Sequence, residues 1–198
     1  MKAAIDWLTR RRADTYLPFA ILVVVWQWPR QDKWAIVMYG GGAALLFAGG
    51  FLRFWASRYC GKRIGHGAEP RLATTGPYAM CRNPLYLANL TIATGFLLLA
   101  HLWWAVVPFW LWGLWCHSRT IRREETSLKK RFGQTYLEYK AQTTRWFPRI
   151  IKALRGRKEP LYSWGDVLRR EAGAMVACLA GAALIVFKNL YIAPKLGF

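Results

Sequence analysis

Long apolar runs alternate with short basic segments along this chain of 198 residues. The apolar runs, which contain almost no charge, cover residues 16–28, 34–55, 85–100, 102–115 and 172–191. The membrane helices expected from them cover about residues 16–30, 34–56, 85–100, 102–117 and 172–192. A helix needs roughly 20 apolar residues to cross the hydrocarbon core of a membrane, and fewer where aromatic and basic residues anchor its ends. The pattern therefore predicts an all-α integral membrane protein with about five transmembrane helices, as a single membrane domain over residues 1–198.

The junctions and small residues of these runs add two expectations. The third and fourth runs meet at His101, which predicts a tight helical hairpin. Gly40, Gly41 and Gly42 lie within the second run. Small residues usually let membrane helices approach one another closely, and the alternative is that they leave room for a ligand tail.

The net charge of +19 is concentrated between the apolar runs. Residues 118–170 hold 15 Lys and Arg but 5 Asp and Glu, whereas the loop between the first two runs holds only Arg30 and Lys33, offset by Asp32. The positive-inside rule then predicts that the N-terminus and the basic loops face the cytoplasm, as in a bacterial-type inner membrane. The same residues suit anionic lipid headgroups, whereas no basic motif supports nucleic acid as a partner.

Familiar metal and nucleotide motifs are absent from the sequence. The four cysteines form no CxxC pair and are expected to be reduced thiols, and the three histidines lack metal-ligand neighbours. No GxSxG, HExxH, Walker or GxGxxG element occurs. We therefore expect no metal, and any nucleotide-like cofactor must be held without a Rossmann fingerprint.

Residues 76–89, GPYAMCRNPLYLAN, form a polar approach to the third apolar run. Asn83 followed by Pro84 is a typical helix start, with Asn as N-cap and Pro at the first helical position. Arg82 and the unpaired N–H groups of this start then lie at the membrane surface, which favours an anionic or carbonyl group there.

Tyr86 and Asn89 lie three residues apart on one face of the same helix. An amide inside an apolar helix needs a hydrogen-bond partner, which favours a binding role for Asn89. Ordinary helix capping together with an interfacial tyrosine is the alternative.

A helical pattern over residues 118–147 predicts a cytoplasmic amphipathic helix, and residues 148–170 form a basic C-terminal connector. At about 100° per residue, the apolar side chains of this helix share one stripe. The stripe consists of Ile121, Leu128, Phe132, Tyr136 and Tyr139.

Two adjacent glutamates fall on this stripe, Glu125 near its centre and Glu124 at its edge. A carboxylate there is costly unless a cation or a hydrogen-bond donor meets it. The alternatives are a structural ion pair with a loop arginine, an ion pair with Lys129 one turn later, and contact with a polar ligand.

The two segments GPYAMCRNPLYLAN (76–89) and REETSLKKRFGQTYLEYKAQTTRWFP (123–148) together resemble the isoprenylcysteine carboxyl methyltransferase family and its phospholipid methyltransferase relatives. The family pattern is GPY, then RHPxYxG, then an EE-containing helix followed by FGxxYxxY and R-x-x-P. The resemblance covers about residues 72–148. It implies a membrane enzyme with a cytoplasm-facing S-adenosylmethionine pocket in that region and a lipid substrate that enters from the bilayer.

The resemblance also implies site residues at the positions that match these motifs. The expected cofactor-binding residues are Tyr78, Asn83, Pro84, Tyr86, Asn89, Glu124, Glu125 and Tyr136. Arg82 and Glu125 are the expected catalytic residues, and Arg145 is expected to bind the substrate. Asn83 stands where the family has histidine and Ala88 where it has glycine. Asn retains a hydrogen bond but cannot titrate near neutral pH, so activity depends on whether that histidine only fixes the cofactor.

We therefore predict an S-adenosylmethionine-dependent methyltransferase that acts on a lipid or prenylated small molecule at the cytoplasmic membrane face. One alternative is an NADPH-dependent membrane reductase of the sterol-reductase type, whose usual extra helices this short chain lacks. The other is a non-catalytic lipid-binding or assembly protein on the same scaffold, which the Asn83 departure favours. The acceptor, the atom that is methylated and the oligomeric state stay open.

Overall fold

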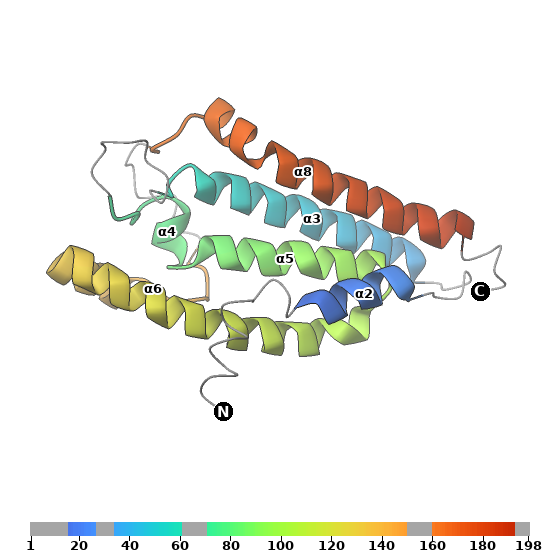
Figure 1. Cartoon of the computed structure of the whole chain (residues 1–198), viewed down its shortest axis with the longest axis horizontal. Helices are drawn as coiled ribbons and strands as arrows, with labels where there is room; N and C mark the ends of the chain where they lie inside the picture. Colours follow the sequence, from blue (N-terminus) through green and yellow to red (C-terminus); the bar gives the residue numbers. More distant parts are fainter. Residues whose placement is uncertain (1–15, 27–33, 61–70, 150–159, 193–198) are drawn as a thin grey trace. The chain divides into compact units, whose positions relative to one another are not determined.

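A computed structural model describes residues 16–26, 34–60, 71–149 and 160–192, and in this part of the chain the regular elements are all helices (Figure 1). They are α2 (Leu17–Val25), α3 (Ala35–Ser57), α4 (Pro77–Met80), α5 (Pro84–Leu99), the 3₁₀ turn η3 (Trp103–Ala105), α6 (Val106–Gln142), α8 (Trp164–Phe187) and the π-helical turn η4 (Lys188–Ile192). The predicted all-α class is confirmed. All four cysteines are free, as expected.

Two helices are long and apolar enough to cross a membrane. These are α3, with 23 residues and a mean hydropathy of 1.8, and α8 with η4, with 29 residues and a mean hydropathy of 1.9. Their apolar side chains are mostly exposed, unlike those of a core helix in a soluble protein: only 11% and 6% of the most apolar stretch is buried. They match the second and fifth predicted spans.

The other predicted spans differ from these two. Helix α5 has 16 residues and α2 has nine, both below the length that a straight span requires. The first predicted span ends at residue 30, outside the described residues. A total of five membrane helices therefore stays a prediction.

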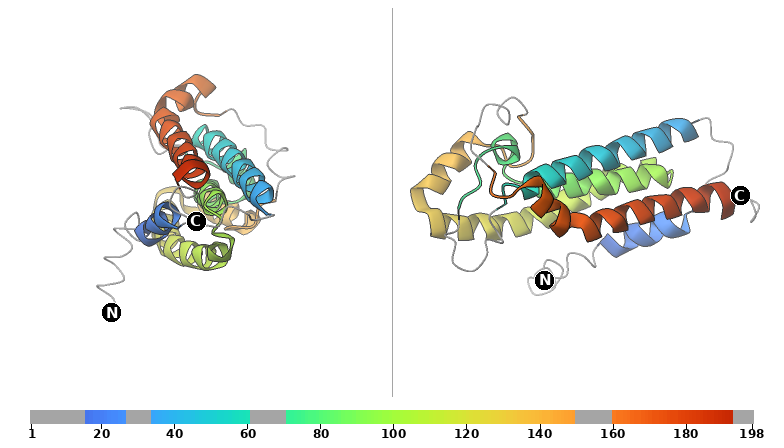
Figure 2. Two further views of the ribbon diagram at one scale, coloured as in Figure 1. Left: turned by 90° about the vertical axis from the view of Figure 1, so that its right-hand side faces the viewer. Right: turned by 90° about the horizontal axis from the view of Figure 1, so that it is seen from above.

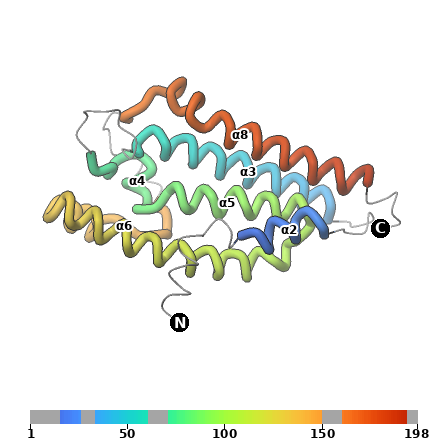
Figure 3. Tube along the Cα trace, in the orientation of Figure 1, coloured from blue at the N-terminus to red at the C-terminus, as the bar shows by residue number. Residues whose placement is uncertain are grey.

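The predicted fourth membrane helix, 102–117, and the predicted cytoplasmic helix, 118–147, are not separated by a break, since α6 runs through residues 117 and 118. Helix α6 has no break across residues 114–132, because these residues contain no Gly or Pro to end it. Its one irregularity is Gly133, whose φ of 53° and ψ of −125° favour glycine. The last part of α6 turns away from the preceding part there, as Figure 2 and the trace in Figure 3 show.

The predicted hairpin at His101 is confirmed. His101 has a φ of 58°, its N–H donates to the carbonyl of Leu98 (2.9 Å), and the N–H of Leu102 donates to the carbonyl of Leu97 (2.8 Å). This is the Schellman pattern that ends a helix. It ends α5 and directs the chain into η3.

The contacts divide the chain into two units, each described by itself. Unit 1 comprises Met1–Phe47, Leu90–Thr120 and Ala174–Phe198, and unit 2 comprises Ala48–Asn89 and Ile121–Gly173.

Unit 1 is built around a close approach of α3 and α5. A Cβ added to Gly42 would lie 2.9 Å from the carbonyl oxygen of Gly95, and one added to Gly95 would lie 2.8 Å from that of Gly42. Gly40, by contrast, faces open space. Helix packing therefore explains Gly42, the third glycine of the run.

Polar side chains in unit 1 close the ends of two helices. The ammonium of Lys188 donates to three carbonyl groups at the end of α2, in residues 23–26. The side-chain amide of Asn189 donates to the carbonyl of Leu99 at the end of α5 (3.0 Å). Both bonds satisfy terminal carbonyls that would otherwise lack partners in apolar surroundings.

Candidate functional site

The candidate site lies in unit 2, and the segment that begins it starts with a turn that requires glycine. Gly76 has a φ of 58°, and a Cβ there would lie 2.6 Å from the ring of Tyr59, so only glycine fits. The single turn of α4 follows, and the hydroxyl of Tyr139 donates to the carbonyl of Tyr78 within it (2.7 Å). The turn is thereby attached to α6.

The segment between α4 and α5 is also bonded to the loop after α6. The N–H of Arg82 donates to the carbonyl of Thr144 (2.9 Å). The side-chain amide of Asn83 donates to the carbonyl of Arg145 (3.1 Å). Asn83 therefore tethers this loop, and Pro84 begins α5 as predicted. A donated bond of this kind does not require a titratable group at position 83.

Glu125 lies at the centre of an ion-pair cluster. Arg82 donates to Oε1 from Nη2 (3.1 Å) and Nε (3.3 Å), while Arg145 (3.0 Å) and Lys140 (3.1 Å) contact Oε2. Nη1 of Arg82 also donates to the carbonyls of Lys140 and Thr143. These ion pairs, rather than the alternative pair with Lys129, balance the buried carboxylate.

The cluster determines the charge of Glu125. Burial by itself opposes ionisation, but Lys140, Arg145 and Arg82 outweigh it, so the pKa of Glu125 lies below its ordinary value of 4.5. Glu125 is therefore an anion at neutral pH and a weak proton acceptor.

Glu124, the neighbouring carboxylate, has different partners. The hydroxyl of Tyr86 donates to Oε1 of Glu124 at 3.0 Å. Asn89, one turn further along α5, accepts a hydrogen bond from Nη1 of Arg53 at 2.7 Å. The amide thus has the partner that the sequence required, and that partner is a cation of α3.

Arg53 also connects Asn89 to α8. Arg53 contacts Oε2 of Glu171 through Nε (2.9 Å) and Nη2 (2.8 Å), and Ser57 donates to Oε1 (3.0 Å). A charged pair on two helices of membrane-spanning length is costly unless well bonded. These bonds fix Arg53 and, through it, Asn89.

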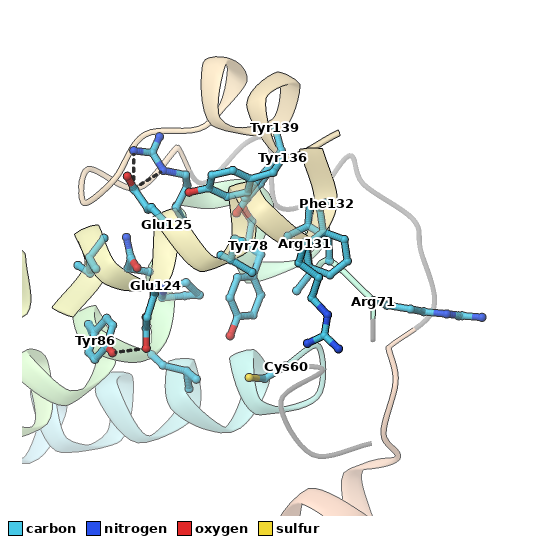
Figure 4. Close-up of a pocket in the computed structure, with 18 of the residues that line it drawn as sticks. Cys60, Arg71, Tyr78, Tyr86, Glu124, Glu125, Arg131, Phe132, Tyr136 and Tyr139 are labelled. Atoms are coloured by element: carbon cyan, nitrogen blue, oxygen red, sulfur yellow. Dashed lines mark hydrogen bonds and ion pairs between the residues drawn. The ribbon is translucent and has the colours of Figure 1, made fainter. Parts of the chain in front are cut away.

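A cavity of about 310 Å³ lies in unit 2 and is lined by several of these side chains (Figure 4). Its walls include all the residues predicted for catalysis and cofactor binding: Tyr78, Arg82, Asn83, Pro84, Tyr86, Asn89, Glu124, Glu125 and Tyr136. The volume is at the lower end of the range for small-molecule pockets. The predicted substrate-binding residue Arg145 does not line this cavity, but it bonds to Glu125 from the other side.

Three tyrosines give the cavity neutral, aromatic walls. Burial raises the pKa of Tyr136 to about 12, and it raises those of Tyr78 and Tyr139 as well. All three hydroxyls therefore stay protonated at neutral pH. Tyr136 is 2% exposed, and its hydroxyl has no hydrogen-bond partner within the described part of the chain. A buried donor of this kind suits an acceptor atom of a ligand.

Sequence reasoning missed several residues of the cavity wall. Arg53 is one, although a charge near the end of the second apolar run was a usable signal. Arg131 and Arg71 also line the cavity and are exposed, and no sequence signal separated them from the many other basic residues. Phe132, on the predicted stripe, forms part of the same wall.

Comparison with known families identifies the family of this chain. The sequence profile of the phospholipid methyltransferase family matches residues 37–135, half of the chain. The protein belongs to this family. No curated protein and no solved structure matches the chain. The matched region contains the segments from α3, α5 and α6 that form most of the cavity. Family membership and the two apolar helices together indicate a membrane methyltransferase that acts on lipid.

Proposed function

We propose that this phospholipid methyltransferase homologue uses S-adenosylmethionine and methylates a lipid or lipidated substrate at the cytoplasmic membrane face. The observation that supports this most is the cavity, because the motif residues of the family resemblance converge on it from separate segments. The topology and the remaining membrane helices belong to the same proposal. They rest on the positive-inside rule and on the apolar runs.

The residues of the cavity wall fit this cofactor. Glu124 can accept hydrogen bonds from an ammonium or ribose group. The rings of Tyr78 and Phe132 suit a purine or a sulfonium cation. Bound S-adenosylmethionine would supply a methyl group on a positively charged sulfur.

Placement is the main task of the protein in such a transfer. Methyl transfer is an in-line displacement, so holding the acceptor in line provides much of the acceleration. We assign the predicted catalytic residues Arg82 and Glu125 to this positioning, since they bond to one another and to the loop after α6. A carboxylate acceptor needs no base. For an amine acceptor, Glu125 is poorly suited to take the proton, because three cations hold it as an anion. Glu124 is the other carboxylate of the cavity wall.

Calorimetry on detergent-purified protein tests the cofactor. S-adenosylmethionine and S-adenosylhomocysteine are titrated, with NADPH as the ligand of the alternative reductase. We expect saturable binding of the first two, weakened about tenfold by Glu124→Gln, because a hydrogen bond to a charged group is lost. Glu138→Gln is the matched control, since Glu138 is exposed on the same helix and outside the cavity wall.

The outcomes separate the alternatives. Binding of NADPH alone would favour the reductase, and binding of none of the three would favour the non-catalytic scaffold. Once cofactor binding is established, transfer of labelled methyl groups to phosphatidylethanolamine, a prenylcysteine and a quinone-like acceptor identifies the substrate.

A further inference from the structure

A second hollow, of about 360 Å³, lies on the other side of Glu125 in unit 2. Arg122 and Lys129 line it from the part of α6 before Gly133, and Lys140 and Arg145 from the part of the chain after it. The turn at Gly133 brings these two groups of basic residues together, which helical periodicity alone does not.

Positive charge in this hollow exceeds negative charge. Four cationic side chains line it, with Glu125 as the only carboxylate in the lining. Glu125 is already paired with three cations, Arg82, Lys140 and Arg145. Arg122 and Lys129 make no ion pair within the described residues, so they add charge that no carboxylate there balances. Like charges gathered in this way repel one another until an anion joins them.

A buried donor provides a second, independent indication of a ligand. Tyr136 lines this hollow as well, is 2% exposed, and has a hydroxyl without a partner within the described part of the chain. A buried hydroxyl that makes no hydrogen bond costs free energy, and an acceptor oxygen in the hollow would remove that cost.

We propose that this hollow binds a phosphate group, either free or as a phosphate ester of a lipid headgroup. Phosphate offers several acceptor oxygens in different directions, which suits arginine and lysine donors from two parts of the chain together with a hydroxyl. The site goes beyond the proposed methyl transfer and does not depend on it. Half of its lining, Tyr136, Leu137, Lys140 and Arg145, lies after residue 135 and therefore outside the family match.

Calorimetry on the full-length protein in neutral detergent tests this site with two probes, inorganic phosphate and short-chain phosphatidic acid. Lys129→Gln and Lys130→Gln form a matched pair, since both residues are exposed neighbours on α6 but only Lys129 lines the hollow. We expect Lys129→Gln to raise the Kd about fivefold, near the upper end for one exposed charge pair, and Lys130→Gln to leave it within twofold.

Tyr136→Phe provides the second readout. It removes only the hydroxyl, so we expect a Kd raised severalfold with no fall in thermal stability of the ligand-free protein. Saturation by inorganic phosphate identifies the phosphate group itself as the ligand, and saturation by phosphatidic acid alone identifies a lipid headgroup. The proposal is overturned if neither probe binds saturably, if Lys129→Gln leaves the Kd unchanged, or if both lysine variants weaken binding equally.

Discussion

Unit 1 and unit 2 are each stabilised by a different kind of contact. In unit 1 two glycines, Gly42 and Gly95, let the backbones of α3 and α5 approach closely because they have no side chains. In unit 2 ion pairs and hydrogen bonds around Glu125 and Arg53 join separate segments.

The same helices contribute to both units, since α3, α5, α6 and α8 each have residues in both. The difference therefore comes from a few positions along these helices and not from different elements. Apolar packing tolerates some variation in volume, whereas a buried charge without its partner is strongly destabilising. Substitutions should thus act very differently in the two units.

The largest expected effect comes from Glu125→Gln in unit 2. Arg82, whose side chain is 11% exposed, loses its counter-charge, and we expect the free energy of unfolding to fall by about 3 kcal/mol. Thermal denaturation in detergent measures it. Glu138→Gln, on the exposed side of α6, should stay within about 0.5 kcal/mol of the unsubstituted protein. Equal losses for both variants would contradict the central role of this cluster.

The next effect comes from Gly42→Ala in unit 1. The added Cβ would lie 2.9 Å from a backbone oxygen of α5, which cannot move as a side chain can, so we expect a loss of about 2 kcal/mol. Gly40→Ala is the control two residues away, because nothing lies within 4 Å of its Cβ. The same denaturation assay compares them, and a Gly42→Ala protein as stable as Gly40→Ala would disprove the close approach.

A smaller effect should follow from Glu171→Gln. Arg53 loses a charged partner but is one-third exposed, so we expect about 1 kcal/mol of destabilisation. Because Arg53 also holds Asn89 at the cavity, binding of S-adenosylmethionine should weaken a few-fold. Ser57→Ala removes only the hydroxyl bond to Glu171 and should weaken that binding less. If the Glu171→Gln protein binds S-adenosylmethionine as tightly as the unsubstituted protein, α8 does not influence the cavity.

The smallest effect is the pH dependence of the stability that Glu125 contributes in unit 2. The pKa of Glu125 is lowered in the folded protein, so its stabilising contribution is complete above its ordinary value of 4.5 and is lost as pH falls through the lower folded value. The difference in melting temperature between the unsubstituted protein and Glu125→Gln should be constant between pH 6 and 8, within the range where native proteins are usually most stable. It should shrink below about pH 4.5. A difference that grows on acidification would have the wrong sign for this carboxylate.

Much of the fold could be predicted from the sequence, because apolar runs and helix stop signals act locally. The helices α3 and α8 and the hairpin at His101 follow from hydropathy and from the meeting of two runs. The change from apolar to charged composition near residue 117 does not end α6. Composition changes the environment of a helix, whereas Gly and Pro change its backbone.

The wall of the candidate site was also largely predictable. The residues of the GPY and EE segments line one cavity, and a buried carboxylate on the apolar stripe had to be paired. Which cations pair with Glu125 was not predictable, since Arg82, Lys140 and Arg145 are distributed over more than 60 residues of a chain rich in arginine and lysine.

The sequence by itself determined that this protein is helical and that two of its helices suit a membrane. It also showed which segments carry polar groups that could take part in binding or catalysis. Both follow because hydropathy and helical periodicity are properties of neighbouring residues. Only the tertiary structure decided that Glu125 is held by three cations, that Arg53 connects Glu171 to Asn89, and that the turn at Gly133 forms a second basic hollow. The reason is physical. Ion pairs between distant residues depend on how the backbone folds back on itself, and that path is determined by packing and by glycine conformations rather than by the pattern of any one segment.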